Sequence, residues 1–276
     1  MPELPEVEVV KQGLSPLLSG RTIVDLVSDG KSLRTPVPVS MMQKLLPGKA
    51  ILSVKRRAKY LLLELEDKTL LIIHLGMTGK LGLFPKGAPE IPHDHICWYL
   101  DNDMELRFND IRRFGSVVLL PAEKSSLLEN TFFHATGPEP FDEAFNADYL
   151  LQKAAGRKKP IKNFIMDSSV VAGIGNIYAN ESLFKAKIRP SKPSGSISKK
   201  KWHILIGEIR NVLNEAIACG GSTISDFIGA SGDRGYFQIN FNVYGRKDQS
   251  CPRCSIPIKL LKLGGRSSFF CPKCQK

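Results

Sequence analysis

Four of the six cysteines stand as two C-x-x-C pairs near the end of the 276-residue sequence. Residues 255–270 separate the pairs, a spacing that is typical of structural zinc sites. Four thiolates complete the tetrahedral coordination of Zn²⁺ and leave no position for a reacting water molecule. A redox role would need a thioredoxin-like βαβ context, which the flanking sequence lacks. We therefore predict one structural Zn²⁺, held by Cys251, Cys254, Cys271 and Cys274.

A second candidate for chemistry is the N-terminus, which begins MPELPE. Removal of the initiator methionine, which is common before a small residue, would leave Pro2 with a free secondary amine. An α-amine has a pKa of about 7.7–8.0, so part of it is an unprotonated nucleophile at neutral pH, and amines form Schiff bases with carbonyl-like carbons. The neighbouring Glu3 suits general acid or base catalysis. Alternatively, Glu3 and Glu6 only stabilise the start of a helix.

The charge of the chain indicates its class of partner. Thirty-nine Lys and Arg against 27 Asp and Glu give a net charge of +12. This excess attracts anions, so nucleic acid or an anionic membrane is the expected partner. The sequence has no apolar run of about 18 residues, which argues against a membrane-spanning helix, and its acidic N-terminus does not resemble a secretion signal. We expect a soluble, cytoplasmic protein without a membrane partner.

The first half of the chain must position the N-terminal residues, and its pattern is mainly β. An opening helix is predicted over Pro5–Leu18, where apolar residues recur every three to four positions. Short apolar or alternating runs separated by turn formers then predict a β-sandwich or barrel. The expected strands are Arg21–Ser28, Ile51–Val54, Tyr60–Glu66, Leu70–His74, His95–Leu100, Glu105–Phe108 and Gly115–Leu120.

The second half is predicted to be helical and to end in a zinc-binding β-hairpin. The expected helices are Ala147–Ala155, Ile161–Met166, Ile177–Ala186 and Lys199–Ala218, and the hairpin strands are Leu260–Leu263 and Arg266–Phe270. A mobile loop is expected over Ser231–Asn240 because of its glycines and polar residues. We expect an α+β multidomain chain with an N-terminal domain over 1–135, a linker over 136–147, a helical domain over 148–240 and a zinc finger over 241–276.

The N-terminal string, taken with motifs along the whole chain, resembles the bacterial formamidopyrimidine-DNA glycosylase family. The matching blocks follow the family's order and end in its four-cysteine zinc finger. They are Met1–Glu8, Lys55–Leu61, His74–Met77, His93–His95, Asp110–Gly115, Gly137–Pro140, Gly173–Tyr178 and Val243–Arg246. The related endonuclease VIII branch has Gly at position 4, so Leu4 favours the branch that acts on purine lesions.

The resemblance implies four catalytic residues. Pro2 would attack the anomeric carbon of the damaged nucleotide and leave an imine, and Glu3 would donate or accept protons during base loss and ring opening. Lys59 would assist the first elimination, and Arg266 would bind the phosphates and assist the second. From the residues alone, Lys59 is equally well a solvated member of a basic cluster, and Arg266 an ordinary hairpin arginine.

The resemblance also implies seven DNA-contacting residues: Met77, Arg112, Phe114, His74, His93, Arg157 and Asn176. Met77, Arg112 and Phe114 would fill the void left by an extracted base, although Met77 and Phe114 are more often core residues. The other four would contact phosphates. Asn176, following the Gly173-Ile174-Gly175 turn, would be the N-cap of its helix in a helix–two-turn–helix motif. Residues 157–162 would add generic positive charge, and Asp110 would brace the arginine loop.

The activity implied is that of a bifunctional DNA glycosylase and AP lyase. It would excise 8-oxoguanine and formamidopyrimidines from double-stranded DNA and cut the strand by β,δ-elimination, acting as a monomer. Two alternatives remain open: an endonuclease VIII-like glycosylase for oxidised pyrimidines, and a non-catalytic binder of damaged DNA that uses the same basic surface.

Overall fold

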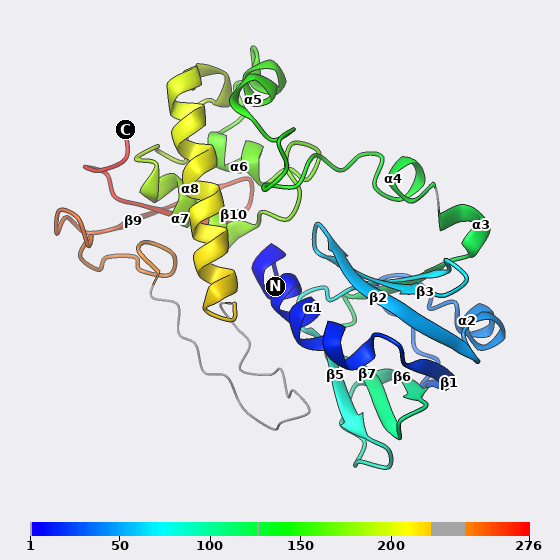
Figure 1. Cartoon of the computed structure of the whole chain (residues 1–276). Coiled ribbons are helices and arrows are strands. Elements are labelled where there is room, and N and C mark those ends of the chain that lie inside the picture. Colours follow the sequence, from blue (N-terminus) through cyan, green and yellow to red (C-terminus); the bar gives the residue numbers. More distant parts are fainter. Residues whose placement is uncertain (1, 126, 222–240) are drawn as a thin grey trace. The chain divides into compact units, whose positions relative to one another are not determined.

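The computed structural model describes residues 2–125, 127–221 and 241–276, which divide into two compact units (Figure 1). The first unit comprises residues 2–134 with 220–221, and the second comprises residues 135–219 with 241–276. The loop predicted over 231–240 lies outside the described residues. In the part of the chain that is described, no helix combines the length and the apolar character needed to span a bilayer.

Eight antiparallel strands form the first unit, in the order β5-β7-β6-β1-β2-β3-β4-β8. The short pairing of β1 with β2 joins two four-stranded halves, β5-β7-β6-β1 and β2-β3-β4-β8. The strands are β1 (Thr22–Ser28), β2 (Lys49–Arg57), β3 (Tyr60–Leu65), β4 (Leu70–His74), β5 (Gly79–Pro85), β6 (Asp94–Leu100), β7 (Met104–Asp110) and β8 (Ser116–Leu120).

A single hydrophobic cluster draws side chains from both halves of the sheet and from the opening helix α1 (Leu4–Leu18). On α1 the buried positions Val7, Val10, Leu14 and Leu18 form one face, which packs against β2, β3 and β5. Burying side chains of this kind contributes about 1.5–3 kcal/mol each. The predicted fold class, an N-terminal β-sandwich with an opening helix followed by helical and zinc-hairpin parts, is confirmed.

Four elements of the first unit, one strand and three short helices, were not expected from the sequence. Strand β5 pairs with β7 over its whole length, but Gly79, Gly82 and Pro85 give it the composition of a loop. It lies at an edge of the sheet, where a terminal proline is tolerated. Helix α2 (Val39–Leu45) is a short element that begins directly after Pro38. Two further short helices, α3 (Ala122–Ser125) and α4 (Leu128–Thr131), follow β8.

The second unit consists of helices followed by the hairpin β9 (Lys259–Leu263) and β10 (Arg266–Phe270). Helix α7 is central to it, since α7 packs against α6, α8 and β10. Side-chain caps begin two of the helices: Asn146 accepts the Tyr149 N–H, and Ser198 accepts the Lys201 N–H. The helices are α5 (Ala147–Ala154), α6 (Ile161–Ile165), α7 (Asn176–Lys185) and α8 (Lys199–Ala218), with a 3₁₀ turn η1 at Ser194–Ser196.

Candidate functional site

Glu3 is a buried carboxyl group at the start of α1, directly after Pro2. Its side chain is 2 % exposed, and Glu3 and Glu6 form a reciprocal capping box in which the Glu3 N–H donates to Glu6 Oε2 at 2.8 Å. The half-buried Pro2 precedes this cap. The helix-capping alternative is therefore true of these glutamates, but it does not exclude a chemical role. The cap fixes the Glu3 side chain beside the residue that would carry the amine.

Lys59 lies in a two-residue turn that joins β2 to β3. Arg57 pairs with Tyr60 across this turn, and Ala58 takes the left-handed backbone conformation with φ 54°. Lys59 thus lies at the tip of the hairpin formed by β2 and β3. The next residue, Tyr60, pairs with His74 at the end of β4, and their rings are 4.7 Å apart. The hairpin therefore brings Lys59 into the neighbourhood of His74.

His74 is held as a neutral imidazole. Burial lowers its pKa to about 4, and the positive charges of Arg34 and Lys59 act in the same direction. Its Nδ1 accepts the Gly76 N–H at 3.0 Å, so in the neutral ring the proton resides on Nε2. A neutral imidazole with a protonated Nε2 is suited to donate a hydrogen bond to an anionic oxygen.

Asp110 organises the loop that carries Arg112 and Phe114. Its carboxylate accepts the Gly115 N–H at 2.7 Å and the Thr78 hydroxyl at 2.5 Å, and Thr78 in turn accepts the Arg112 N–H. The backbone of this loop also approaches Gly76 so closely that a Cβ there would lie 2.4 Å from the Gly115 nitrogen. The predicted bracing role of Asp110 is confirmed, and Gly76 is required for the close approach.

The two apolar side chains of this region point to solvent. Met77 is 40 % exposed and Phe114 is 44 % exposed, so the alternative that they are core residues is wrong. The Arg112 guanidinium lies over the Phe114 ring, 4.6 Å from its centroid. Both residues line a pocket of about 600 Å³ together with Ser32, Leu33, Arg34 and Arg113. This concave surface combines three arginines with an exposed aromatic ring.

His93 is exposed and belongs to the same hydrogen-bonded region of the first unit. It has a φ of 76°, and its carbonyl accepts the Asp110 N–H at 3.1 Å. The structure thus brings Lys59, His74, Met77, Arg112 and Phe114 to one set of connected loops, with His93 attached to the same bracing residue.

In the second unit, Asn176 is the first residue of α7 and not its N-cap, which corrects the sequence-based expectation. The N-cap position is occupied by Gly175 in an extended conformation, without a side-chain cap. Half-exposed Asn176 therefore presents its side chain beside the first turn of the helix. Such a helix start favours an anion.

Arg266 is exposed at the start of β10, directly after the Gly264–Gly265 turn. Gly264 adopts a φ of 54°, and a Cβ there would lie 2.3 Å from Nδ2 of Asn163 on α6. The turn can approach α6 because it has no side chain at this position. The contact places the arginine-bearing end of the hairpin against α6.

The basic stretch 157–162 is not uniformly exposed. Arg157 is exposed, and its guanidinium lies 5.7 Å from the centroid of the Phe164 ring. Lys162 is only 1 % exposed, and its Nζ donates to the Ser267 carbonyl and the Ser268 hydroxyl, both at 2.7 Å. The expectation of generic surface charge is therefore wrong for Lys162, which instead attaches α6 to β10.

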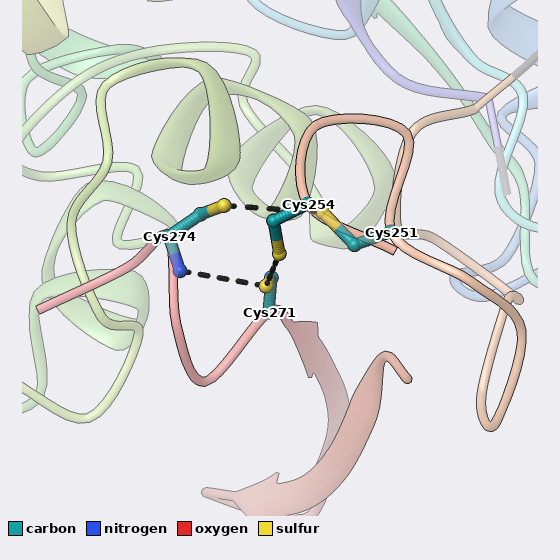
Figure 2. A group of neighbouring side chains, drawn as sticks. All are labelled: Cys251, Cys254, Cys271 and Cys274. Carbon is teal, nitrogen blue, oxygen red and sulfur yellow. Dashed lines mark hydrogen bonds between the residues drawn. The ribbon is translucent and has the colours of Figure 1, made fainter. Parts of the chain in front are cut away.

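The four predicted zinc ligands converge at the end of the second unit (Figure 2). Their Sγ atoms all lie within 4.8 Å of one another, with 3.4 Å between Cys254 and Cys271 and 4.0 Å between Cys251 and Cys274. Zn–S bonds of about 2.3 Å in a tetrahedron place sulfur atoms about 3.8 Å apart. The arrangement fits one structural Zn²⁺, as predicted.

Comparisons with known proteins agree over the whole chain. Residues 1–117 match the formamidopyrimidine-DNA glycosylase N-terminal domain, residues 136–228 its H2TH domain, and residues 248–276 the zinc finger found in FPG and IleRS. A Formamidopyrimidine-DNA glycosylase of Hydrogenovibrio crunogenus is 46% identical over 276 residues, covering 100% of this chain and 97% of the relative. The chain belongs to the formamidopyrimidine-DNA glycosylase family.

Further members of the formamidopyrimidine-DNA glycosylase family support this assignment. The protein of that name from Hahella chejuensis is 44% identical, with both chains fully covered. A mutant of Lactococcus lactis FPG in complex with DNA containing Fapy-dG superposes with a TM-score of 0.90 at 35% identity, covering 100% of both chains. The L. lactis protein bound to DNA with an abasic site gives a TM-score of 0.89 at 34% identity, covering 99% of both chains.

Sequence reasoning did not identify several residues that the structure connects to these sites. The charge of Arg34 lowers the pKa of His74, which shows that Arg34 lies near it, and Thr78 connects Asp110 to Arg112. Glu181 on α7 is buried, and its carboxylate accepts the N–H groups of Asn242, Val243 and Tyr244 at 2.9 Å. Each acts through a contact distant in sequence, for which no local pattern exists.

Proposed function

We propose that this chain is a bifunctional DNA glycosylase and AP lyase that removes oxidised purines, chiefly 8-oxoguanine opposite cytosine and formamidopyrimidines, from duplex DNA. The observation that carries the proposal is the agreement over the full chain with proteins named Formamidopyrimidine-DNA glycosylase. The solved L. lactis relatives hold DNA with Fapy-dG or an abasic site, which correspond to a substrate and to a later stage of this reaction. The net charge of +12 suits such a polyanion.

In the proposed reaction the nucleophile is the amine of Pro2 after removal of Met1. Its nitrogen bonds to C1′ of the damaged nucleotide while the glycosidic bond breaks, and the departing base takes the electron pair of that bond and a proton from the amine. Glu3 donates a proton to the sugar ring oxygen as the ring opens and the imine forms. The buried capping box supports this role because it holds the Glu3 carboxyl beside Pro2.

Two eliminations from the imine then cut the strand. Loss of a proton from C2′ expels the 3′ phosphate, and loss of a proton from C4′ expels the 5′ phosphate. Lys59 assists the first elimination, which is supported by its half-buried position in the hairpin turn near the neutral His74. Arg266 binds the phosphate that leaves in the second, because a guanidinium can contact two phosphate oxygens at once. Hydrolysis of the imine regenerates Pro2.

Removal of a base requires its extraction from the helix. We assign this step to Met77, Arg112 and Phe114. Their exposure and the bracing by Asp110 support the assignment, because a wedge must be rigid and must not belong to the core. Inserting such side chains costs a few kcal/mol of base unstacking, which contacts to the bent DNA offset.

Backbone contacts hold the DNA while this occurs. We assign them to His74 and His93 in the first unit and to Arg157, Asn176 and Arg266 in the second. The exposed positive charge of the two arginines and the position of Asn176 in the first turn of α7 support phosphate binding. The neutral His74 acts as a hydrogen-bond donor through Nε2.

Zinc takes no part in the chemistry. Cys251, Cys254, Cys271 and Cys274 would hold one ion whose four thiolate ligands supply structural stabilisation of the hairpin that carries Arg266. We further propose that the protein acts as a monomer in the cytoplasm, where its DNA substrate is found. Light scattering of the free protein and of its 1:1 complex with a duplex tests the monomer.

A strand-cleavage assay on single-lesion duplexes tests the function. An 8-oxoguanine:cytosine duplex should be cut to products with phosphates at both ends of the gap, and a duplex with an oxidised pyrimidine should be cut much more slowly. The opposite preference would indicate an endonuclease VIII-like enzyme. Binding of both duplexes without cleavage would indicate a non-catalytic damage binder, and either result would overturn the proposal.

A further inference from the structure

The side-chain amide of Asn180 connects two parts of the second unit that the proposed function assigns to phosphate binding. Asn180 lies on α7, one helical turn after Asn176, and is 0 % exposed. Its Nδ2 donates to the Asn176 carbonyl at 2.6 Å. Its Oδ1 accepts the backbone N–H of Phe269 at 2.7 Å. One buried amide thus contacts both the start of α7 and a strand of the zinc hairpin.

The strand that it contacts is β10, which begins with Arg266. Within the hairpin, Arg266 pairs with Leu263 and Phe269 pairs with Leu260, so the two residues lie on one short strand. The hydrogen bond from the Phe269 N–H to Asn180 Oδ1 fixes the position of that strand along α7. Lys162 supports the same strand by its bonds to the Ser267 carbonyl and the Ser268 hydroxyl.

We propose that Asn180 is a positioning residue that sets the spacing between Asn176 and Arg266, so that both contact the phosphates of one DNA strand together. The inference rests on the proposed phosphate contacts of these two residues. An amide suits the role because it offers a donor and an acceptor on one short side chain. Ala cannot make either bond, and Asp cannot donate to the Asn176 carbonyl when ionised.

The alternative is that Asn180 contributes only to the stability of the fold, and salt dependence separates the two. Each phosphate contact contributes about one unit to the slope of log K against log salt concentration. A variant that is merely less stable keeps that slope when measured well below its unfolding temperature. A variant whose Arg266 no longer reaches its phosphate loses about one unit.

The experiment measures the affinity for a duplex with an uncleavable abasic-site analogue, over a range of salt concentrations, for Asn180→Ala, Arg266→Ala and the double variant. Asn180→Ala should weaken binding about tenfold and flatten the slope by about one unit. The double variant should resemble Arg266→Ala, because the coupled residues act as one unit.

Ser182→Ala is the matched control: Ser182 is buried on the same helix, and its hydroxyl has no hydrogen-bond partner among the described residues. It should keep the wild-type slope.

The outcomes distinguish this inference from the function on which it rests. If Arg266→Ala leaves the slope unchanged, the proposed phosphate contact fails, and the positioning role fails with it. If Arg266→Ala flattens the slope but Asn180→Ala does not, or if the two losses of affinity simply add, only the positioning role is overturned.

A measurement on the wild-type protein keeps the test decisive if Asn180→Ala does not fold. The Phe269 amide hydrogen should exchange slowly in the free zinc-bound protein, with no further slowing when the duplex binds, because the Asn180 contact is already formed. Rapid exchange that becomes slow only on DNA binding would overturn the inference.

Discussion

The residues assigned to DNA contact are held differently in the two units of the molecule. In the first unit, the residues assigned to DNA contact are at loop and strand ends, and Met77, Arg112 and Phe114 are exposed above a backbone that Asp110 braces. In the second unit, Lys162, Asn180 and Glu181 are buried, and they attach helices to the zinc hairpin and to the segment before it.

This difference teaches how the work is divided. In the proposed function the first unit carries Pro2, Glu3 and the inserting side chains, so substitutions of these residues should alter the reaction more than DNA binding. In the proposed function the second unit supplies the phosphate contacts of Asn176 and Arg266, so substitutions there should weaken DNA binding first. The predictions below test this division, beginning with the largest effect.

Glu3→Gln should separate chemistry from binding most strongly. Glutamine keeps the length of the side chain and can still cap α1, but it cannot transfer the proton. Because general acid–base catalysis contributes about 10²–10⁴-fold, excision of 8-oxoguanine in single-turnover assays should fall by about that factor. Affinity for an abasic-analogue duplex should change little. Glu8→Gln, on the same helix, is the control and should retain excision. Equal excision by Glu3→Gln and the wild type would reduce Glu3 to a helix cap.

Cys254→Ser should have its main effect on the second unit. The loss of one thiolate should lower bound zinc and, with it, DNA affinity by about tenfold or more, because metal binding and folding of such sites are coupled. Elemental analysis gives the zinc content, and a titration with the abasic-analogue duplex gives the affinity. Cys219→Ser, at an exposed cysteine outside the cluster, is the matched control. Full zinc content in Cys254→Ser would exclude the four-cysteine site.

Phe114→Ala should impair base extraction more than DNA binding. Without the wedge, excision of 8-oxoguanine should slow by about tenfold, since unstacking costs a few kcal/mol, while cleavage at a pre-formed abasic site should be nearly unchanged. Leu52→Ala removes another exposed apolar side chain of the first unit and should affect neither substrate. Equal losses on both substrates would show that Phe114 does not act as a wedge.

The pH response of His74 is the smallest predicted effect. Its pKa is lowered to about 4 by burial and by the positive charges of Arg34 and Lys59. In the unfolded chain His74 takes up a proton near pH 6.5, whereas in the folded protein it does so only near pH 4. Its contribution to the free energy of unfolding is therefore fully present above about pH 6.5 and is lost as the pH falls toward 4. The loss should reach about 2 kcal/mol at pH 5. An NMR titration that found a charged His74 ring at pH 6 would contradict this assignment.

The sequence was most informative where structure depends on local periodicity. Strand β4 and helix α8 begin and end at the predicted residues, and the two C-x-x-C pairs predicted the cysteine cluster. Strand β5 was missed because its glycines and proline resemble a loop, and pairing with β7 overrides that composition. Asn176 was predicted to be the N-cap of α7, but it is the first helical residue and Gly175 is the N-cap, because the sequence does not fix the backbone conformation of Gly175.

The candidate site shows the same limit. Glu3, Lys59 and Arg266 stand out through motifs, and their catalytic roles remain predictions. Lys162 looked like one charge in a basic run, yet it is buried because the partners Ser267 and Ser268 lie more than a hundred residues further along the chain. Asn180 and Arg34 carried no signal for the same reason: their partners are distant in sequence, and only folding brings them together.

The central claim is that the nucleophile is the amine of Pro2 and not that of Lys59. At pH 7 roughly one in ten α-amines of pKa near 8 is unprotonated, compared with about one in a few thousand ordinary lysines. The direct test treats the protein with borohydride during reaction with an 8-oxoguanine:cytosine duplex and locates the reduced adduct by peptide mass spectrometry. The adduct should map to Pro2, and protein that retains Met1 should form none while still binding the duplex. An adduct on Lys59, or full activity with Met1 retained, would contradict the account.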